Sequence, residues 1–245
     1  REMGGLPEVF VGCGAAIRRP VFEALGGYDA SFGYYAEEYD FSARVLLAGG
    51  SVGFDRRFRV DHMKSPSGRD MNVILERLVR NNGWVMQRYA PSSERRAQLR
   101  EVRRRCRAIA ANEHARNGCL EGLRQLRETV HMQGRAEMSI AMFDRFTGLA
   151  AAREALRKAH SEAHFETAAI VRDGKNAWCV RDALEELGVR ITDPEAAEVL
   201  VVGTMSPGPM LDAQEQLERS GRRVVAPWIG AGTTERAERF LSAAS

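Results

Sequence analysis

The chain has 245 residues, of which 44% are hydrophobic, and it carries a formal net charge of +3. This length and apolar content allow more than one compact unit. The small net charge gives no reason to expect a nucleic-acid partner. No apolar run approaches the roughly 20 residues that span a bilayer, and there is no signal-peptide pattern. Four scattered cysteines without Cys-x-x-Cys spacing favour neither a zinc site nor a disulfide framework, so a cytoplasmic location is expected.

The first predicted elements lie between residues 8 and 25. Glu8 to Ile17 is predicted to be a buried strand followed by small residues, and Pro20 to Leu25 a short helix that begins with proline. The small residues Gly12 and Gly14 would let the backbone approach a ligand closely. Tight packing between the strand and the helix explains these two glycines equally well.

An acidic helix is predicted next. The turn Gly26-Gly27-Tyr28-Asp29 leads into a loop, and Glu37, Glu38 and Asp40 then begin a short amphipathic helix. The helix dipole favours acids in a first turn, and Asp40 can pair with Arg44 at i,i+4. Glu38 has no basic residue at helical spacing. A carboxylate of this kind beside a glycine-rich loop is a candidate general base.

A histidine and a polar loop follow two predicted strands, Ser51–Phe54 and Phe58–Val60. His62 stands at the end of the second strand, where a histidine is either a hydrogen-bonded structural residue or a metal ligand. Lys64 and Arg69 belong to the loop that follows. This loop is either a solvated connection or a cover for a diphosphate, whose charge the two basic side chains would offset.

Five short motifs occur in the order and at the spacing typical of one enzyme family. They are Val11-Gly12-Cys13-Gly14-Ala15, Arg18-Arg19-Pro20-Val21-Phe22, Gly26-Gly27-Tyr28-Asp29, Glu37-Glu38-Tyr39-Asp40-Phe41-Ser42-Ala43-Arg44 and Val60-Asp61-His62. Through these motifs the chain resembles the acceptor-side, C-terminal half of a family 2 glycosyltransferase of the GT-A fold. The resemblance covers roughly the first third of the chain and fades around Asn81.

This resemblance implies an inverting glycosyltransferase. Such an enzyme transfers a sugar from a nucleotide-sugar donor to the hydroxyl of a glycan or lipid-linked acceptor. Glu38 would take the proton of the acceptor hydroxyl, at a position where the family usually has Asp. Glu37 and Asp40 would support Glu38 or contact the acceptor.

The resemblance also implies sites for the donor and for a divalent ion. Gly12 and Gly14 would border the donor diphosphate. His62 would complete the coordination of Mg²⁺ or Mn²⁺ on that diphosphate. The remaining substrate-binding residues would be Asp29, Lys64 and Arg69.

Members of this family build the nucleotide pocket from an N-terminal βαβ half that ends in an Asp-x-Asp segment. No such half precedes Gly12, and the sequence begins with Arg1 instead of Met. We therefore expect a fragment that lacks the donor-binding half and is inactive alone. The alternative is a non-catalytic assembly or ligand-binding module in which the transferase half is a remnant.

Helices are predicted to dominate from Met71 to about residue 164. Met71–Tyr89 would form one or two helices, because Asn81-Asn82-Gly83 is a break signal. A basic helix over residues 94–107 would follow and end at Asn117-Gly118. Its arginines form either a solvated face or a peripheral contact with anionic lipids at the inner face of a membrane. Two more helices are expected around Leu120–Val130 and Met138–Phe146.

From about Phe165, short apolar strands alternate with helices, which predicts a parallel sheet of Rossmann-like type. The loop Arg172–Asn176 lacks the glycines that a dinucleotide needs for close backbone approach. The loop Gly203–Pro209 is either a ligand-binding edge or a rigid connection. The strands are predicted over Thr167–Val171, Val189–Thr192, Glu198–Val202 and Arg223–Ala226, and the helices over Ala177–Leu187, Met210–Ser220 and Glu235–Ala244.

The sequence thus predicts an α/β protein in three parts. Residues 1–90 would form a partial GT-A glycosyltransferase domain on the acceptor side. Residues 91–164 would form a helical linker region. Residues 165–245 would form a small Rossmann-like domain with a structural or regulatory role.

Overall fold

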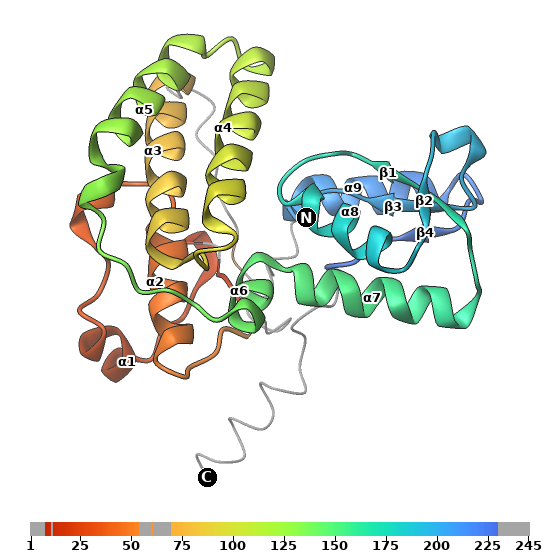
Figure 1. Ribbon diagram of the computed structural model, residues 1–245, viewed down its shortest axis with the longest axis horizontal. Helices are drawn as coiled ribbons and strands as arrows, with labels where there is room; N and C mark the ends of the chain where they lie inside the picture. The colour runs from red at the N-terminus through yellow and green to blue at the C-terminus, as the bar shows by residue number, and fades with distance from the viewer. Residues whose placement is uncertain (1–7, 11, 54–59, 61–69, 230–245) are drawn as a thin grey trace. The chain divides into compact units, whose positions relative to one another are not determined.

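The computed structural model describes residues 8–10, 12–53, 60 and 70–229. The fold is α/β, with a helical N-terminal region and a small four-stranded sheet in which all strands are parallel (Figure 1). Two compact units divide the chain. The helical unit comprises Gly12–Gly50 and Arg59–Phe143, and the sheet unit comprises Arg1–Val11, Ser51–Phe58 and Asp144–Ser245. In the part of the chain that the structure describes, no helix has the length and apolarity to span a bilayer.

Three long helices form the centre of the helical unit. They are α3 (Met71–Tyr89), α4 (Arg95–Asn112) and α5 (Arg116–Thr129), and they follow the shorter α1 (Arg19–Ala24) and α2 (Glu37–Leu47). Helix α3 packs against α2, α4 and α5 and is therefore the central helix (Figure 1). Its core positions include Leu75 and Val79, both fully buried.

Helix α3 runs without interruption through Asn81-Asn82-Gly83, so of the two predicted alternatives, one helix or two, the single helix is confirmed. The buried Asn81 side chain donates hydrogen bonds to backbone carbonyls outside its own helix. A Cβ atom on Gly83 would lie 2.3 Å from Cδ1 of Leu126, so glycine at this position admits a leucine of α5. Both residues serve contacts between elements, and a local rule for chain breaks does not see such contacts.

Glycines of α5 also allow close packing between helices. Helix α4 ends at Asn112, and Asn117-Gly118 lies inside α5, so the prediction that this pair ends the basic helix is wrong. A Cβ atom on Gly118 would lie 2.0 Å from the carbonyl oxygen of Asn72. A Cβ atom on Gly122 would lie 2.5 Å from the carbonyl oxygen of Glu76. The two glycines therefore allow α5 to approach the backbone of α3 closely.

The elements predicted before residue 70 have mixed outcomes. Helices α1 and α2 confirm the two short helices. The strand predicted over Glu8–Ile17 is wrong within the described residues, because Val9 forms only an isolated bridge and Gly12–Gly14 forms a 3-10 turn. Residues 51–53 are irregular, and the rest of the predicted strand pair lies outside the described residues, Val60 excepted.

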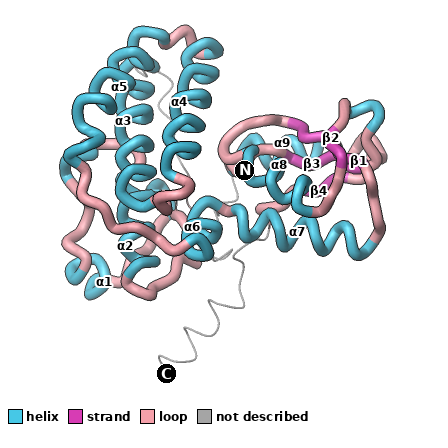
Figure 2. The backbone as a smooth tube through the Cα atoms, viewed as in Figure 1, coloured by secondary structure: helices cyan, strands magenta, loops and turns pink. Residues whose placement is uncertain are grey.

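The sheet unit confirms the predicted alternation of strands and helices. Its strands are β1 (Thr167–Val171), β2 (Arg190–Ile191), β3 (Val199–Val202) and β4 (Val224–Val225), in the order β2-β1-β3-β4 (Figure 2). Helix α8 (Ala177–Glu186) connects β1 to β2, and α9 (Pro207–Glu218) connects β3 to β4. The helix predicted over Glu235–Ala244 lies outside the described residues.

Helices cover both sides of this sheet. Leu217 of α9 packs against a buried cluster that consists of Ala169, Ala197 and Leu200. Figure 1 shows α9 on one side of the sheet and α7 (Leu149–Glu162) on the other. Strand β3 is buried along its whole length, as expected for a central strand of a parallel sheet. Helix α6 (Ile140–Thr147) precedes α7.

The predicted boundary at residue 90 falls between α3 and α4. These two helices pack against each other within the helical unit. The division of the chain into three parts at residues 90 and 164 stays a prediction.

Candidate active site at the mouth of helix α2

A strained loop delivers Glu37 and Glu38 to the first turn of α2. Tyr35 and Ala36, which precede them, have φ angles of 72° and 66°. This left-handed region costs a residue other than glycine roughly 1–2 kcal/mol. Ala36 also occupies the N-cap position without any side-chain hydrogen bond to the helix. Two such residues in succession indicate a loop whose shape is held by its surroundings.

Asn81 of α3 holds this loop. Its Nδ2 atom lies 3.0, 3.0 and 2.7 Å from the carbonyl oxygens of Phe32, Tyr34 and Tyr35 and donates to them. The sequence reasoning missed this role. The available signal was an asparagine in a helix interior, where it is a poor helix former.

Phe32 fixes the root of the same loop. Its ring is fully buried and meets the Trp84 ring edge-on, with 5.5 Å between the centroids. The Arg88 guanidinium lies 5.0 Å from the centroid of the Phe32 ring. Asn81, Trp84 and Arg88 follow one another at helical spacing, so a single face of α3 clamps the loop root.

Asp40 lies at the centre of a buried ion cluster beneath the helix mouth. Its side chain is fully buried. It accepts hydrogen bonds from Arg44 Nε at 2.9 Å, Arg88 Nη1 at 2.8 Å and Tyr89 Oη at 2.6 Å. Burial and the Asp40 charge raise the pKa of Tyr89, which therefore stays a hydrogen-bond donor. The predicted pair of Asp40 and Arg44 is confirmed, and the burial of Asp40 favours a supporting role over direct contact with an acceptor.

Asp29 belongs to the same cluster. Its Oδ2 atom pairs with Arg88 at 2.7 Å, and its Oδ1 atom accepts from the Ser31 backbone at 2.9 Å. Burial works to raise the pKa of Asp29, but the hydrogen bonds from Ser31 and Arg88 outweigh it and hold this pKa below the ordinary value. Two arginines thus offset two carboxylates, since Arg88 serves both and Arg44 serves Asp40.

Arg44 also ties the glycine turn to α2. It donates to the carbonyl oxygen of Leu25 at 2.6 Å and to that of Gly27 at 2.8 Å. Gly26 and Gly27 have φ angles of 76° and 68°, which glycine adopts without strain. The glycine turn and the acidic helix, separate motifs in the sequence, therefore form one hydrogen-bonded structure.

Tyr28, within that turn, joins Glu37 and Glu38. Its ring packs against Phe22 and Phe41, with centroids 5.4 and 5.5 Å away, and 41% of the residue is exposed. Burial, and then the charges of Glu37 and Glu38, raise the pKa of Tyr28. Its hydroxyl therefore lies within electrostatic reach of both carboxylates. The sequence analysis predicts no role for Tyr28, although Tyr28 belongs to the motif Gly26-Gly27-Tyr28-Asp29.

The two glutamates of the first turn differ in their surroundings. The Oε2 atom of Glu37 is buried and has no hydrogen-bond partner among the described residues. Glu38 is half-buried, and its carbonyl oxygen accepts from Ser42 Oγ at 2.7 Å. Because neighbouring residues of a helix point about 100° apart, the two carboxylates leave the helix in different directions.

The other predicted site residues lie in a 3-10 turn or outside the described residues. Gly12 and Gly14 lie exposed in their 3-10 turn, and a Cβ atom on Gly14 would lie 3.5 Å from Val60. His62, Lys64 and Arg69 lie outside the described residues. Within the described residues there is no group of three or more His, Cys, Asp or Glu that could hold a metal ion.

The edge of the sheet between β1 and β3 is the second place where a ligand is expected, because the chain order reverses there. In this fold two loops close it. Gly174 N donates to Gly203 O at 3.0 Å, and Met205 N donates to Lys175 O at 3.1 Å. A Cβ atom on Gly174 would lie 2.6 Å from Thr204 Oγ1. Backbone hydrogen bonds thus join the two loops. For the loop Gly203–Pro209, this favours a rigid connection over a ligand-binding edge.

Comparison of this chain with protein-family models, with curated proteins and with solved structures finds no match.

Proposed function

We propose that this chain carries the acceptor side of an inverting, family 2-like glycosyltransferase of the GT-A fold. Such an enzyme transfers a sugar from a nucleotide-sugar donor to the hydroxyl of a glycan or lipid-linked acceptor. One observation supports the proposal above the others, namely the division among the acids of α2. Asp40 pairs with Arg44 and Arg88 in a buried cluster, while Glu37 and Glu38 lie half-buried in the first turn, where burial and then their charges raise the pKa of Tyr28.

In this proposal Glu38 is the general base. The acceptor oxygen forms a bond to the anomeric carbon on the face opposite the nucleotide. The bond from that carbon to the diphosphate oxygen breaks, and the diphosphate leaves with the electron pair. The proton of the acceptor hydroxyl passes to a carboxylate oxygen of Glu38. Proton transfer to a positioned group of this kind contributes about 10²–10⁴-fold to a rate.

Asn81, Arg44 and Arg88 are positioning residues in this scheme. They hold the loop and the turn from which Glu38 and Tyr28 project. A misplacement of about 1 Å by a distant mutation can cost a reaction about 10²-fold. The strain at Tyr35 and Ala36 is consistent with a site whose geometry is held in advance of binding.

The proposal includes Mg²⁺ or Mn²⁺ on the donor diphosphate, with His62 as one ligand. His62 lies outside the described residues, and the described residues offer no set of three ligands. The chemistry that a divalent ion would supply is charge stabilisation on the leaving diphosphate. No step given above runs through it.

We further propose that the sheet unit is a Rossmann-like module with a structural or regulatory role. The strand order β2-β1-β3-β4 and the connecting helices support the Rossmann-like assignment. The closed edge between β1 and β3 supports a role without a bound nucleotide.

The test is a transfer assay on the full-length protein that contains this sequence, with UDP-, GDP- and dTDP-sugars and Mn²⁺. Glu38→Gln should lower turnover by about 10²–10⁴-fold with little change in donor affinity. Glu37→Gln is the matched control and should cost much less. Equal losses for the two variants, or no loss for Glu38→Gln, would contradict the assignment of the base.

No transfer and no donor hydrolysis by the wild-type protein, with any of these donors, would favour the other function. In that case the chain is a non-catalytic assembly module. Glu37 and Glu38 would then help to begin the helix, where its dipole favours negative charge, and Asp40 would hold the buried ion cluster.

A further inference from the structure

Helix α4 is far more basic than the rest of the chain. It has seven arginines and one glutamate, a net charge of +6, whereas the whole chain has +3. The remainder of the chain is therefore slightly acidic, and the basic character of α4 does not follow from the overall composition.

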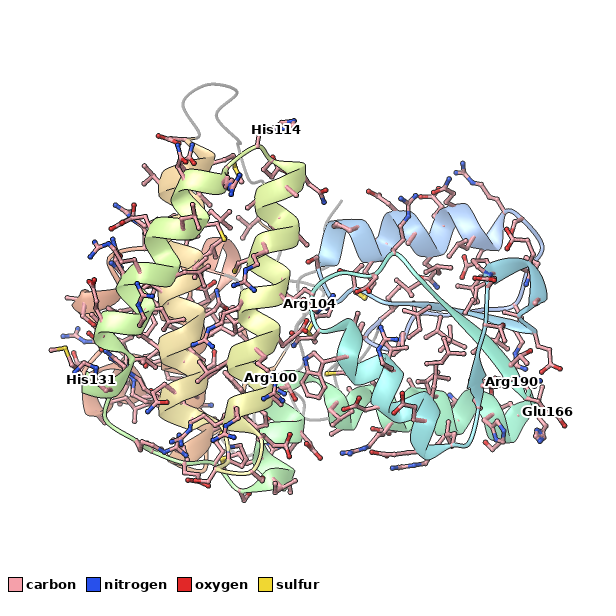
Figure 3. All side chains as sticks on the ribbon, turned by 45° about the horizontal axis from the view of Figure 1, so that its top comes forward. Arg100, Arg104, His114, His131, Glu166 and Arg190 are labelled. Carbon is pink, nitrogen blue, oxygen red and sulfur yellow. The ribbon has the colours of Figure 1, made fainter. Side chains whose placement is uncertain are left out.

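Five of these arginines share one face of α4. At 3.6 residues per turn they fall within about 100° of the helix circumference. Four of them are exposed, and Arg103 is half-buried. Figure 3 shows Arg100 and Arg104 one turn apart on this helix. We define the arginine stripe as Arg96, Arg100, Arg103, Arg104 and Arg107.

The arginine stripe works against the stability of the helix that carries it. Like charges at i,i+4, such as Arg96 and Arg100, repel each other. Arg96 also stands in the first turn, where the helix dipole disfavours positive charge. The single acid of α4, Glu101, pairs with Arg104 at 2.7 Å. Among the described residues, Arg96, Arg100 and Arg107 form no ion pair.

Helix α5 shows the arrangement that helix stability favours. Its Arg124 forms ion pairs with Glu121 at 2.5 Å and with Glu128 at 2.7 Å, at i,i+3 and i,i+4 spacing. With three arginines and two glutamates, α5 has a net charge of +1. Acids thus offset two of the three arginine charges of α5 but only one of the seven of α4. The arginine stripe requires a reason other than helix stability.

We propose that the arginine stripe of α4 binds the anionic surface of a lipid bilayer. An 18-residue helix is about 27 Å long, and a stripe along one of its sides can meet a flat layer of anionic headgroups over its whole length. The attraction reaches about one Debye length, about 10 Å at 0.1 M salt. Because the arginines lie on one face of the helix, all of them can lie within this distance of the bilayer surface at the same time.

Binding of this kind is electrostatic and needs no insertion into the bilayer. The residues of α4 that turn inward, including Cys106 and Ala110, are buried within the helical unit. A nucleic acid fits this surface less well. Helix α4 has no aromatic side chain on which bases could stack. It also packs against α3 and α5, which obstructs entry into a groove.

Flotation of the full chain with lipid vesicles tests the proposal. At about 0.1 M salt the chain should bind phosphatidylcholine vesicles that contain phosphatidylglycerol and should not bind pure phosphatidylcholine vesicles. Binding should be lost at about 0.5 M salt. The triple variant Arg96→Gln, Arg100→Gln, Arg107→Gln should bind at least about tenfold more weakly, because each arginine near the surface strengthens binding about fivefold.

The matched control is the triple variant Arg116→Gln, Arg127→Gln, Arg219→Gln. These three arginines are exposed and lie outside α4, so the control removes the same charge from other parts of the chain. It should bind within about twofold of wild type. Equal losses in the two variants would overturn the proposal, because overall charge would then explain the binding. Binding to pure phosphatidylcholine would overturn it as well.

Two further measurements complete the test. Thermal unfolding of the stripe variant should occur at the wild-type temperature or above it, because like-charge repulsion is removed. A lower unfolding temperature would show that the arginines stabilise α4 and would count against the proposal. Tighter binding to a short DNA duplex than to the anionic vesicles, in the same salt, would overturn the assignment to lipid. These assays use no sugar donor, so their outcome is independent of glycosyl transfer.

Discussion

The mouth of α2 and the sheet edge between β1 and β3 are both places where loops meet at the ends of regular elements, but they are held in opposite ways. At α2, hydrogen bonds from side chains hold the loop and the turn, and these side chains belong to Asn81, Arg44 and Arg88. At the sheet edge, backbone groups bond directly from one loop to the other.

This difference affects which side chains each place leaves accessible. Side chains that reach across from α3 hold the α2 region, where Tyr28 is exposed and Glu38 is half-buried. Backbone closure at the sheet edge leaves too little room at Gly174 even for a Cβ atom. The general rule that ligands bind where strand order reverses points to the sheet edge, whereas the geometry of the described residues favours the helical unit.

The largest effect is expected for Arg88→Ala. This change leaves Asp40 and Asp29 without their shared counter-charge, and breaking a buried ion pair costs about 3–5 kcal/mol. Hydrogen exchange should accelerate in α2 and α3 and stay unchanged in β1 and β3. The control is Arg124→Ala, which removes exposed ion pairs that solvent screens and that therefore contribute little to stability. Similar losses for the two variants would mean that the ion cluster does not support the helical unit.

Asn81→Ala should be the next most severe change. It removes three hydrogen bonds to the strained loop, and the buried groups left unsatisfied cost up to about 3 kcal/mol. The neighbouring Asn82→Ala is a close control, because among the described residues the Asn82 amide bonds only to the Leu78 carbonyl within its own helix. Urea unfolding of the helical unit should separate the two variants. An equally large effect of Asn82→Ala would contradict the proposed anchoring role of Asn81.

A third prediction concerns the closed sheet edge. Gly174→Ala places a methyl group against Thr204 and should destabilise the sheet unit by about 2 kcal/mol. Gly12→Ala is the control, since a Cβ atom on Gly12 has no described atom within 4 Å. Hydrogen exchange of β1 and β3 measures the effect. Unchanged protection in Gly174→Ala would show that the edge has room for a ligand after all.

The smallest expected effect is a titration shift at Tyr28. Its folded pKa lies above the ordinary value of 10, so the stability it contributes is fully present below about pH 10 and is lost as the pH rises through the folded pKa. Glu37→Gln and Glu38→Gln should each lower this pKa in part, because burial is the larger cause. Ultraviolet titration against a Tyr28→Phe reference measures the shift, with Glu23→Gln as a control. If neither change lowers the pKa of Tyr28, the charges of Glu37 and Glu38 do not act on the Tyr28 hydroxyl.

The sheet unit is the part of the fold that the sequence predicts well, because its signals are local. Strand β1 has the predicted bounds, Thr167–Val171. Gly188 and Gly221 follow α8 and α9 with φ angles of 72° and 71°, the conformation in which glycine commonly ends a helix. Short apolar strands between such helices leave few alternatives to a parallel sheet.

The candidate site is only partly predictable. The acids of α2 and the turn before them stand close together in sequence, so a motif identifies them. Asn81 lies 46 to 49 positions from the carbonyls that it binds, and Arg88 lies 48 and 59 positions from its two acids. Local rules misread Asn81 as part of a break because its contribution appears only after the chain has folded.

The buried ring of Phe32 has a consequence for how this protein can change over evolutionary time. Phe32 and Asn81 fix the loop from below, while Tyr34 at its tip is exposed. Substitutions at the tip can therefore accumulate without moving the root, and the acids of α2 keep their place throughout. The loop thus joins a buried frame to an exposed surface, and a change of side chain at the tip can alter that surface while the frame keeps its structure.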